Sequence, residues 1–175
     1  MSLVIDSSIT LAWFFEDERS AAADAVLRKV TESGAVAPSL WRLEVANALQ
    51  MAVRRNRITA AFRDASITDL RALEVAIDPE TDHQAWATTL HLAERCRLTL
   101  YDAAYLELAQ RLGLPLATLD EELRAAGSAL GVSVLGNRRK RDRRMITEAD
   151  RAKKGRCAGG DFDRAASRVT SFSDP

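Results

Sequence analysis

Short apolar runs, each followed by a segment with helical spacing, recur along residues 1–136 and limit what the chain can fold into. Apolar strands that alternate with helices are typical of a parallel sheet covered by helices on both faces. Five runs are predicted to be strands: 2–5, 35–38, 74–78, 114–118 and 132–135. The sequence therefore predicts an α/β fold.

Helices are predicted between these strands from apolar residues at i, i+3 and i+4 spacing. A short run at 98–100 leads into one of them, and Asp102 lies at the junction. Aspartate is a favoured N-cap residue, so Asp102 is interpreted either as a helix cap or as a residue that does chemistry. The predicted helices run from Ser7 or Ser8 through Phe14, over 18–33, from Ser39 through Val53, from about Phe62 to Leu73, over 80–97, from Asp102 through Gln110, and over 121–130.

The charges divide the chain in two, although its 25 basic and 25 acidic residues balance. Residues 1–136 hold 13 Lys and Arg against 19 Asp and Glu, whereas residues 137–175 hold 12 against 6. The second part also has too few large apolar residues to form a core. We predict one folded domain at 1–136 and a basic, disordered tail at 137–175, a split that is typical of contact with nucleic acid or a partner.

Several features point to the cytoplasm and exclude other classes of protein. The chain has no run of about 18 apolar residues that would cross a membrane. Its first residues lack the basic region of a signal peptide. Cys96 and Cys157 lie far apart and fit no zinc-binding spacing. We therefore expect free thiols in a reducing cytoplasm and no membrane association.

Three aspartates occur where predicted strands or apolar runs end. Asp6 ends the first strand, Asp120 follows the fourth, and Asp102 follows the run at 98–100. Ligands of an open parallel sheet bind outside the carboxyl ends of its strands, so the three side chains are expected at one edge. The alternative, that all three are N-caps, fits each of them separately.

Glu44 is the fourth candidate, because it borders the buried face of the helix predicted at 40–53. Burial of a carboxylate is costly unless it is paired or binds a cation. The open alternatives for Glu44 are a salt bridge with Arg42, Arg54 or another base, a carboxylate that reaches solvent, and a metal site. Ser8 and Thr118 lie two residues from Asp6 and Asp120, where their hydroxyls would orient a carboxylate or a water, or cap a helix.

Four converging carboxylates would repel one another, and a hard divalent cation relieves that repulsion. Mg²⁺ or Mn²⁺ is therefore the predicted cofactor, with the four acids as its ligands. Such a site suits metal-assisted hydrolysis of a phosphodiester, in which the metal activates water and neutralises phosphate charge. The predicted ligands are Asp6, Glu44, Asp102 and Asp120.

Taken together, the motifs resemble the PIN-domain ribonucleases, and among them the VapC toxins of bacterial VapBC toxin–antitoxin systems. The resemblance lies in VIDSSITLAWFFEDE, APSLWRLEVANALQMAVRRNRI and LTLYDAAYLELAQRLGLPLATLDEEL, and it covers about residues 3–135. The tail departs from the family pattern. The family's acids match Asp6, Glu44, Asp102 and Asp120, with Ser8 and Thr118 as accompanying hydroxyls, so no motif acid is missing.

The resemblance implies a three-layer α/β/α fold with a mostly five-stranded parallel sheet. It also implies a Mg²⁺- or Mn²⁺-dependent endoribonuclease, the toxin of a type II system, which forms a homodimer and is inhibited by a VapB-like antitoxin. Two alternatives stay open: a PIN nuclease of ordinary RNA processing, and a PIN-fold protein that binds RNA or a partner without cleaving.

Overall fold

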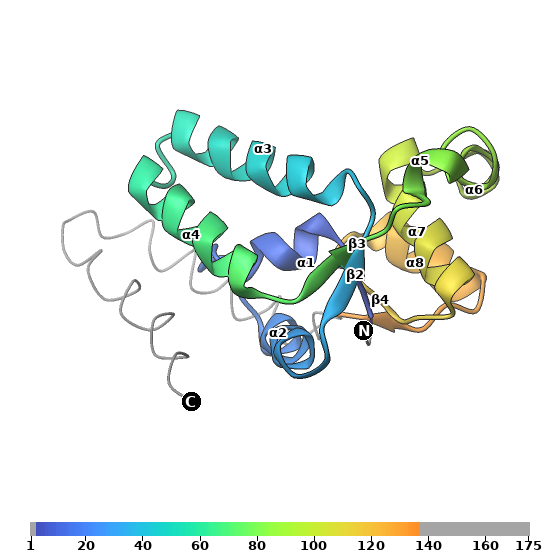
Figure 1. Ribbon diagram of the computed structural model, residues 1–175, viewed down its shortest axis with the longest axis horizontal. Coiled ribbons are helices and arrows are strands. Elements are labelled where there is room, and N and C mark those ends of the chain that lie inside the picture. The colour runs from blue at the N-terminus through green and yellow to red at the C-terminus, as the bar shows by residue number, and fades with distance from the viewer. Residues whose placement is uncertain (1–2, 137–175) are drawn as a thin grey trace, which may run out of the picture. The chain divides into compact units, whose positions relative to one another are not determined.

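The computed structural model describes residues 3–136, in which five strands form one sheet (Figure 1). The strand order is β3-β2-β1-β4-β5, and every neighbouring pair is parallel. The strands are β1 Val4–Ile5, β2 Ala35–Ala37, β3 Val75–Ile77, β4 Leu116–Ala117 and β5 Val134–Leu135. The predicted five-stranded parallel sheet is thereby confirmed.

Helices lie on both sides of this sheet, as the predicted three-layer α/β/α architecture requires. The helices of the first half of the chain, α1 to α4, lie on one side, and α5 to α8 lie on the other (Figure 1). Connections between parallel strands are right-handed. Successive strands are added in one direction along the sheet from β1 to β3 and in the opposite direction afterwards, so the two sets of helices lie on opposite faces. The helices are α1 Ser7–Leu11, α2 Ala21–Ser33, α3 Trp41–Arg54, α4 Ala60–Ala72, α5 Thr81–Gln84, α6 Thr88–Cys96, α7 Leu100–Leu112 and α8 Glu121–Ala129.

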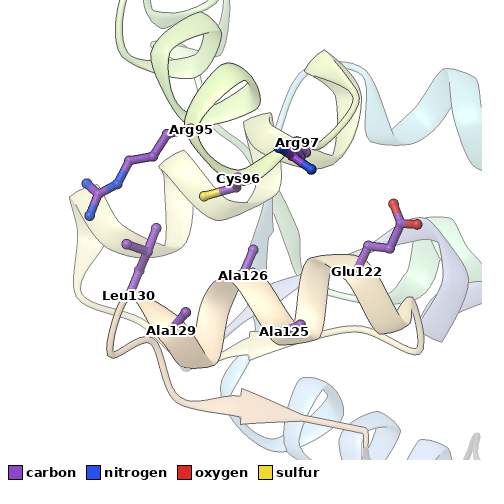
Figure 2. A pocket seen from close by; sticks show the side chains of 8 residues that line it. All are labelled: Arg95, Cys96, Arg97, Glu122, Ala125, Ala126, Ala129 and Leu130. Atoms are coloured by element: carbon purple, nitrogen blue, oxygen red, sulfur yellow. The ribbon is translucent and has the colours of Figure 1, made fainter.

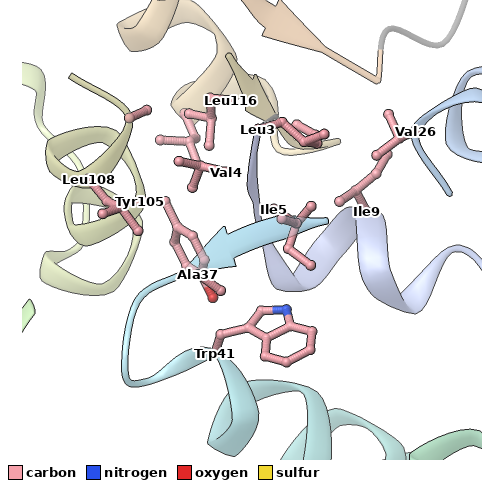
Figure 3. Packing of buried hydrophobic residues seen from close by; sticks show 14 of the residues in the cluster. Leu3, Val4, Ile5, Ile9, Val26, Ala37, Trp41, Tyr105, Leu108 and Leu116 are labelled. Carbon is pink, nitrogen blue, oxygen red and sulfur yellow. The ribbon is translucent and has the colours of Figure 1, made fainter. Parts of the chain in front are cut away.

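The core lies around the two central strands (Figure 3). Val4, Ile5 and Leu116 are completely buried, because helices cover both faces of these strands. This explains why the strands read as continuous apolar runs rather than as alternating patterns. Because β1 is the central strand, the residue that follows it, Asp6, lies at the middle of the carboxyl edge of the sheet.

Four helix predictions need correction. The helix expected to run through Phe14 ends at Leu11, and the helix expected at 18–33 begins at Ala21. The helix expected at 80–97 is two helices, because the backbone leaves the helical region at Ala87, with φ −122° and ψ −102°. The helix expected to begin at Asp102 begins at Leu100, and its N-cap is Thr99, whose hydroxyl accepts the Asp102 N–H at 3.1 Å. Threonine competes with aspartate as a cap, and the helix capped by Thr99 includes Leu100, the last residue of the apolar run at 98–100.

Residues 137–175, which the sequence predicts to be a basic, disordered tail, lie outside the described range, so that statement stays a prediction.

Within residues 3–136, no helix combines the length and apolar character that crossing a membrane needs.

Candidate active site

Asp6 lies directly after β1 and is almost completely buried, with 3% of its surface exposed. Its carboxylate accepts three hydroxyl hydrogen bonds. Ser8 and Thr118 donate to Oδ2 at 2.5 and 2.6 Å, and Ser7 donates to Oδ1 at 3.2 Å. Asp6 occupies the N-cap position of α1, yet its side chain makes no capping bond. The alternative that Asp6 is only a helix cap is therefore wrong.

The two hydroxyls that bond Asp6 are themselves oriented by the backbone. The Leu119 N–H donates to the Ser8 Oγ at 2.9 Å, and the Asp120 N–H donates to the Thr118 Oγ1 at 3.0 Å. Each hydroxyl thus accepts one bond and directs its own proton at Asp6. The structure brings Ser8 and Thr118 together with Asp6, as the sequence predicted for orienting groups.

The backbone carbonyl of Asp6 is held by a second set of hydrogen bonds. The Trp41 indole N–H donates to the Thr10 Oγ1 at 3.1 Å, and the Thr10 hydroxyl donates to the Asp6 carbonyl oxygen at 2.9 Å. Trp41 begins α3, so this buried connection fixes the end of β1 relative to the helix that carries Glu44.

Glu44 lies in the first turn of α3 and is half-buried. Its Oε2 accepts a hydrogen bond from the hydroxyl of Tyr105 on α7. Among residues 3–136, no basic residue, Arg42 and Arg54 included, forms a salt bridge with it, so that alternative for Glu44 is not the arrangement found. Tyr105 was not a sequence candidate, although it lies three residues after Asp102 on the same helix.

The electrostatics show which carboxylates lie close enough to repel. Burial raises the pKa of Asp6, and the hydrogen bonds from Ser8 and Thr118 oppose that rise. Burial also raises the pKa of Glu44; the Tyr105 bond opposes it, and the charges of Asp6 and Asp102 raise it further. Asp6, Glu44 and Asp102 therefore form one repelling group.

Tyr105 completes this group as a neutral donor. Burial, followed by the charge of Asp6 and the contact with Glu44, raises the pKa of Tyr105 far above its ordinary value. The phenol therefore keeps its proton at physiological pH and is the donor in the hydrogen bond to Glu44.

Asp102 and Asp120 each lie at the N-terminus of a helix, Asp102 in the first turn of α7 and Asp120 at the N-cap of α8. The Asp102 Oδ2 accepts a bond from the Thr99 hydroxyl at 2.6 Å, and the Thr99 Oγ1 accepts the Asp102 N–H, so the two residues are paired at the first turn of α7. The Asp120 Oδ1 accepts the Leu123 N–H at 2.7 Å and caps α8. Asp120 is thus a cap in this structure, and its backbone connects to Asp6 through Thr118.

The donor set fits a hard divalent cation. Within the described part of the chain, no three His, Cys, Asp or Glu side chains are already arranged to hold a metal ion. Asp6 is nevertheless a buried carboxylate that, within residues 3–136, forms no ion pair with Lys, Arg or His. A cation that binds oxygen ligands would offset both its burial and the repulsion from Glu44 and Asp102.

The raised pKa of Asp6 predicts a pH dependence of stability. Between the unfolded-state pKa, about 3.9, and the raised value, the folded state binds more protons than the unfolded state. The free energy of unfolding should therefore fall as pH rises through this range. Unfolding of the wild type and Asp6→Asn in chelator at several pH values measures the effect: the wild type should lose stability relative to the variant as pH rises. A constant difference across pH would contradict the assignment.

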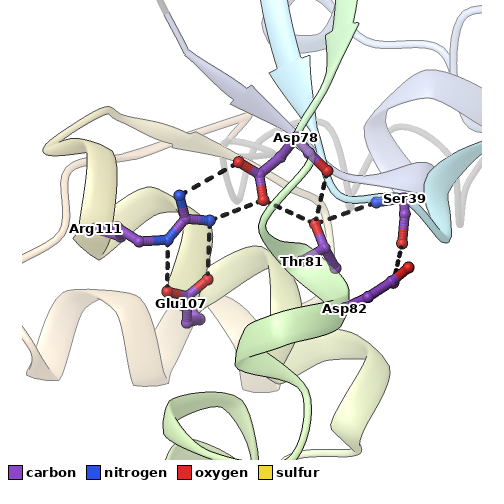
Figure 4. A network of polar contacts seen from close by, with 6 residues as sticks. All are labelled: Ser39, Asp78, Thr81, Asp82, Glu107 and Arg111. Carbon is purple, nitrogen blue, oxygen red and sulfur yellow. Dashed lines mark hydrogen bonds and ion pairs between the residues drawn. The ribbon is translucent and has the colours of Figure 1, made fainter.

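A second polar network lies where β3 ends, at the same edge of the sheet (Figure 4). Arg111, near the end of α7, contacts Asp78 and Glu107, each at 2.8 Å, and these two carboxylates are 6% and 4% exposed. Asp78 Oδ2 also accepts the Thr81 hydroxyl at 2.9 Å. Asp78 is a strand-end acid that the sequence analysis did not single out. Its pairing with Arg111 gives it a structural role that joins β3, α5 and α7.

A cavity of about 540 Å³ lies between the end of α6 and α8, with Cys96 on its wall (Figure 2). None of the six residues predicted for the site lines it. The candidate site is thus the acidic edge of the sheet rather than this cavity.

Comparisons with known proteins agree with the fold and the motifs. The PIN domain family model matches residues 3–128. Ribonuclease VapC3 of Pyrobaculum aerophilum is 33% identical over 127 residues, covering 70% of this chain and 92% of that protein. Ribonuclease VapC3 of Mycobacterium tuberculosis is 34% identical over 102 residues, covering 58% and 72%.

The fold itself has a crystallographic counterpart. The crystal structure of PAE2754 from Pyrobaculum aerophilum superposes with a TM-score of 0.55 at 26% identity, covering 72% of this chain and 84% of that one. The region matched by the PIN domain model contains Asp6 and Asp120, together with the helices that carry Glu44 and Asp102. The chain therefore belongs to the PIN-domain family, and within it to the VapC ribonucleases.

Proposed function

We propose that this protein is a Mg²⁺- or Mn²⁺-dependent endoribonuclease and the toxin of a type II toxin–antitoxin system. The observation that carries the proposal is the buried carboxylate of Asp6, which repels Glu44. It lies beside the point where the strand order reverses between β1 and β4. In open α/β sheets this is where ligands bind.

The division of labour at the site follows from the contacts. Asp6, Glu44, Asp102 and Asp120 would hold the cation. When bound, the cation supplies an activated water and neutralises charge on the scissile phosphate. Ser8 and Thr118 hold the Asp6 carboxylate in a fixed orientation through their directed protons. The complete set of acids favours a cleaving enzyme over a PIN-fold protein that only binds RNA.

The proposed partners are an RNA substrate, a VapB-like antitoxin and a second copy of this chain, in the cytoplasm. Support comes from the relatives, which carry the VapC name. Exposed apolar side chains are consistent with protein partners: Trp86 is 91% exposed and Leu43 is 75% exposed.

Mapping RNA ends in cells tests the proposed activity in its natural setting. Brief induction of the wild type should produce new RNA ends at defined positions, and induction of Asp6→Asn should produce none. Equal RNA ends from both proteins would contradict the proposal.

We further propose that residues 137–175 form a basic tail that binds RNA without reading its sequence. The acidic domain at 1–136 attracts a polyanion poorly, and the tail adds 12 basic residues against 6 acidic ones. Truncation after Gly136 should weaken RNA binding and flatten its salt dependence, because fewer counterions are released. Cleavage positions should not change, since phosphate contacts carry no sequence information.

Binding and cleavage by the full-length and truncated proteins, compared at two salt concentrations, measure this effect. Equal affinity, salt slope and rate would show that the tail has no part in binding. Faster cleavage by the truncated protein at low salt would show instead that the tail restrains the site.

A further inference from the structure

Tyr105 combines complete burial with a polar contact that reaches the candidate site. Its ring lies in the core near Ala37 and Leu108 (Figure 3), and none of its surface is exposed. A buried tyrosine hydroxyl needs a hydrogen-bond partner. Here the partner is the Oε2 of Glu44, which comes from a different helix, α3. Tyr105 therefore fixes one oxygen of a candidate metal ligand.

The same arrangement recurs at the other acids. In each of the four, at least one carboxylate oxygen already accepts a hydrogen bond from the protein. The donors are the Ser8 and Thr118 hydroxyls for Asp6 Oδ2, the Ser7 hydroxyl for Asp6 Oδ1, the Tyr105 hydroxyl for Glu44, the Thr99 hydroxyl for Asp102 and the Leu123 N–H for Asp120. A hydrogen bond takes up one lone pair of a carboxylate oxygen, so a metal competes with Tyr105 for the Oε2 of Glu44, and the other oxygen is the readier ligand.

This restriction matters for the choice of cation. Ca²⁺ takes six to eight oxygen ligands and often binds a carboxylate through both oxygens, whereas Mg²⁺ requires an octahedron at shorter distances. A glutamate that ligates through one oxygen suits the smaller, octahedral cation. The hydroxyl of Tyr105 imposes this condition on Glu44.

We propose that Tyr105 is a positioning residue, which holds Glu44 so that one carboxylate oxygen faces the metal and thereby favours Mg²⁺ or Mn²⁺ over Ca²⁺. The inference rests on the proposed function, because it takes Glu44 as a ligand of the cation. Tyr105 acts through Glu44 and touches neither metal nor RNA.

Substitution of Tyr105 by phenylalanine tests the inference, with Tyr101→Phe as the matched control. Tyr101 lies one turn earlier on α7 and is 63% exposed. Titration calorimetry of the full-length protein with Mn²⁺ and with Ca²⁺ gives the readout. Tyr105→Phe should weaken Mn²⁺ binding about tenfold, the cost typical of losing a partner of a metal ligand. Ca²⁺ binding should stay level or strengthen, and Tyr101→Phe should change neither.

The inference is overturned if Tyr105→Phe binds both cations as the wild type does, or if it loses affinity for both by the same factor. An equal loss would indicate a general disturbance of the fold rather than a lost preference between cations.

A double-mutant cycle separates positioning from packing. If Tyr105 acts through Glu44, then adding Tyr105→Phe to Glu44→Gln should weaken Mn²⁺ binding less than it does in the wild type. If the two losses add fully, Tyr105 acts independently of Glu44 and the inference fails.

A spectroscopic measurement keeps Tyr105 itself in place, in case the phenylalanine variant is unstable. The chain has two tyrosines, so 3-fluorotyrosine in a Tyr101→Phe background labels residue 105 alone. Addition of Mg²⁺ should shift the fluorine resonance, and Glu44→Gln should reduce the shift. A resonance that does not respond to Mg²⁺ would overturn the inference.

Failure of the inference and failure of the proposed function give different results. A wild type that neither binds Mn²⁺ nor cleaves RNA with Mg²⁺ overturns the function, and the role of Tyr105 with it. A wild type that binds and cleaves, alongside a Tyr105→Phe variant that matches it in both cation affinities, overturns only the role of Tyr105.

Discussion

Replacement of Asp6 by asparagine is expected to abolish RNA cleavage while the protein stays folded. Loss of an outer partner of a metal ligand typically costs 10–100-fold, so loss of the ligand itself should cost more than about a hundredfold. The fold should tolerate the change. The asparagine oxygen can take the place of Oδ2, where Ser8 and Thr118 donate, and its amide faces the longer 3.2 Å contact with Ser7.

The thermal midpoint of Asp6→Asn in chelator should equal or exceed that of the wild type, because a negative charge that repels Glu44 is gone. Asp24→Asn is the matched control, since Asp24 pairs with Arg19 on the surface, away from the strand ends. It should cleave as the wild type does. An Asp6→Asn protein that is folded and still cleaves at a near-normal rate would exclude Asp6 as a ligand.

Replacement of Arg111 by methionine is expected to be the most destabilising single change in the charged residues described here. It leaves Asp78 and Glu107, at 6% and 4% exposure, without their shared cation. Removal of one partner from a buried ion pair costs about 3–5 kcal/mol, because an uncompensated charge stays buried. Methionine keeps an apolar side chain at the position, so the loss reports mainly on the charge.

Urea unfolding at neutral pH measures this loss. Arg19→Met is the control, because it breaks an exposed pair with Asp24 and should cost less than about 1 kcal/mol. Equal losses in the two variants would show that the network of Asp78, Glu107 and Arg111 is no stronger than a surface pair.

The layers of the fold could be predicted from sequence because its strands are buried on both faces. Val4, Ile5 and Leu116 belong to continuous apolar runs, and such runs between helical patterns define a covered parallel sheet. Asp6 and Asp120 could be placed at one edge because parallel strands end together. Asp102 was expected to begin its helix but lies in the first turn, behind the N-cap Thr99, because threonine and aspartate are both favoured caps.

The contacts that hold the candidate site could not be read from the sequence. Tyr105 and Glu44 are 61 positions apart, and no local pattern shows that a buried hydroxyl will meet a carboxylate on another helix. Glu107 and Arg111 form an i, i+4 pair that spacing alone suggests. The third residue of this network, Asp78, is 33 positions from Arg111 in the sequence. It reaches Arg111 only because the helices that follow β3 pack together.

The most direct test of the account is cleavage of a synthetic RNA by the purified full-length protein, followed with excess chelator, with Mg²⁺ and with Mn²⁺. The account predicts no cleavage in chelator, cleavage when either cation is restored, and none by Asp6→Asn under any of the three conditions. Cleavage by the wild type at full rate in excess chelator would contradict it.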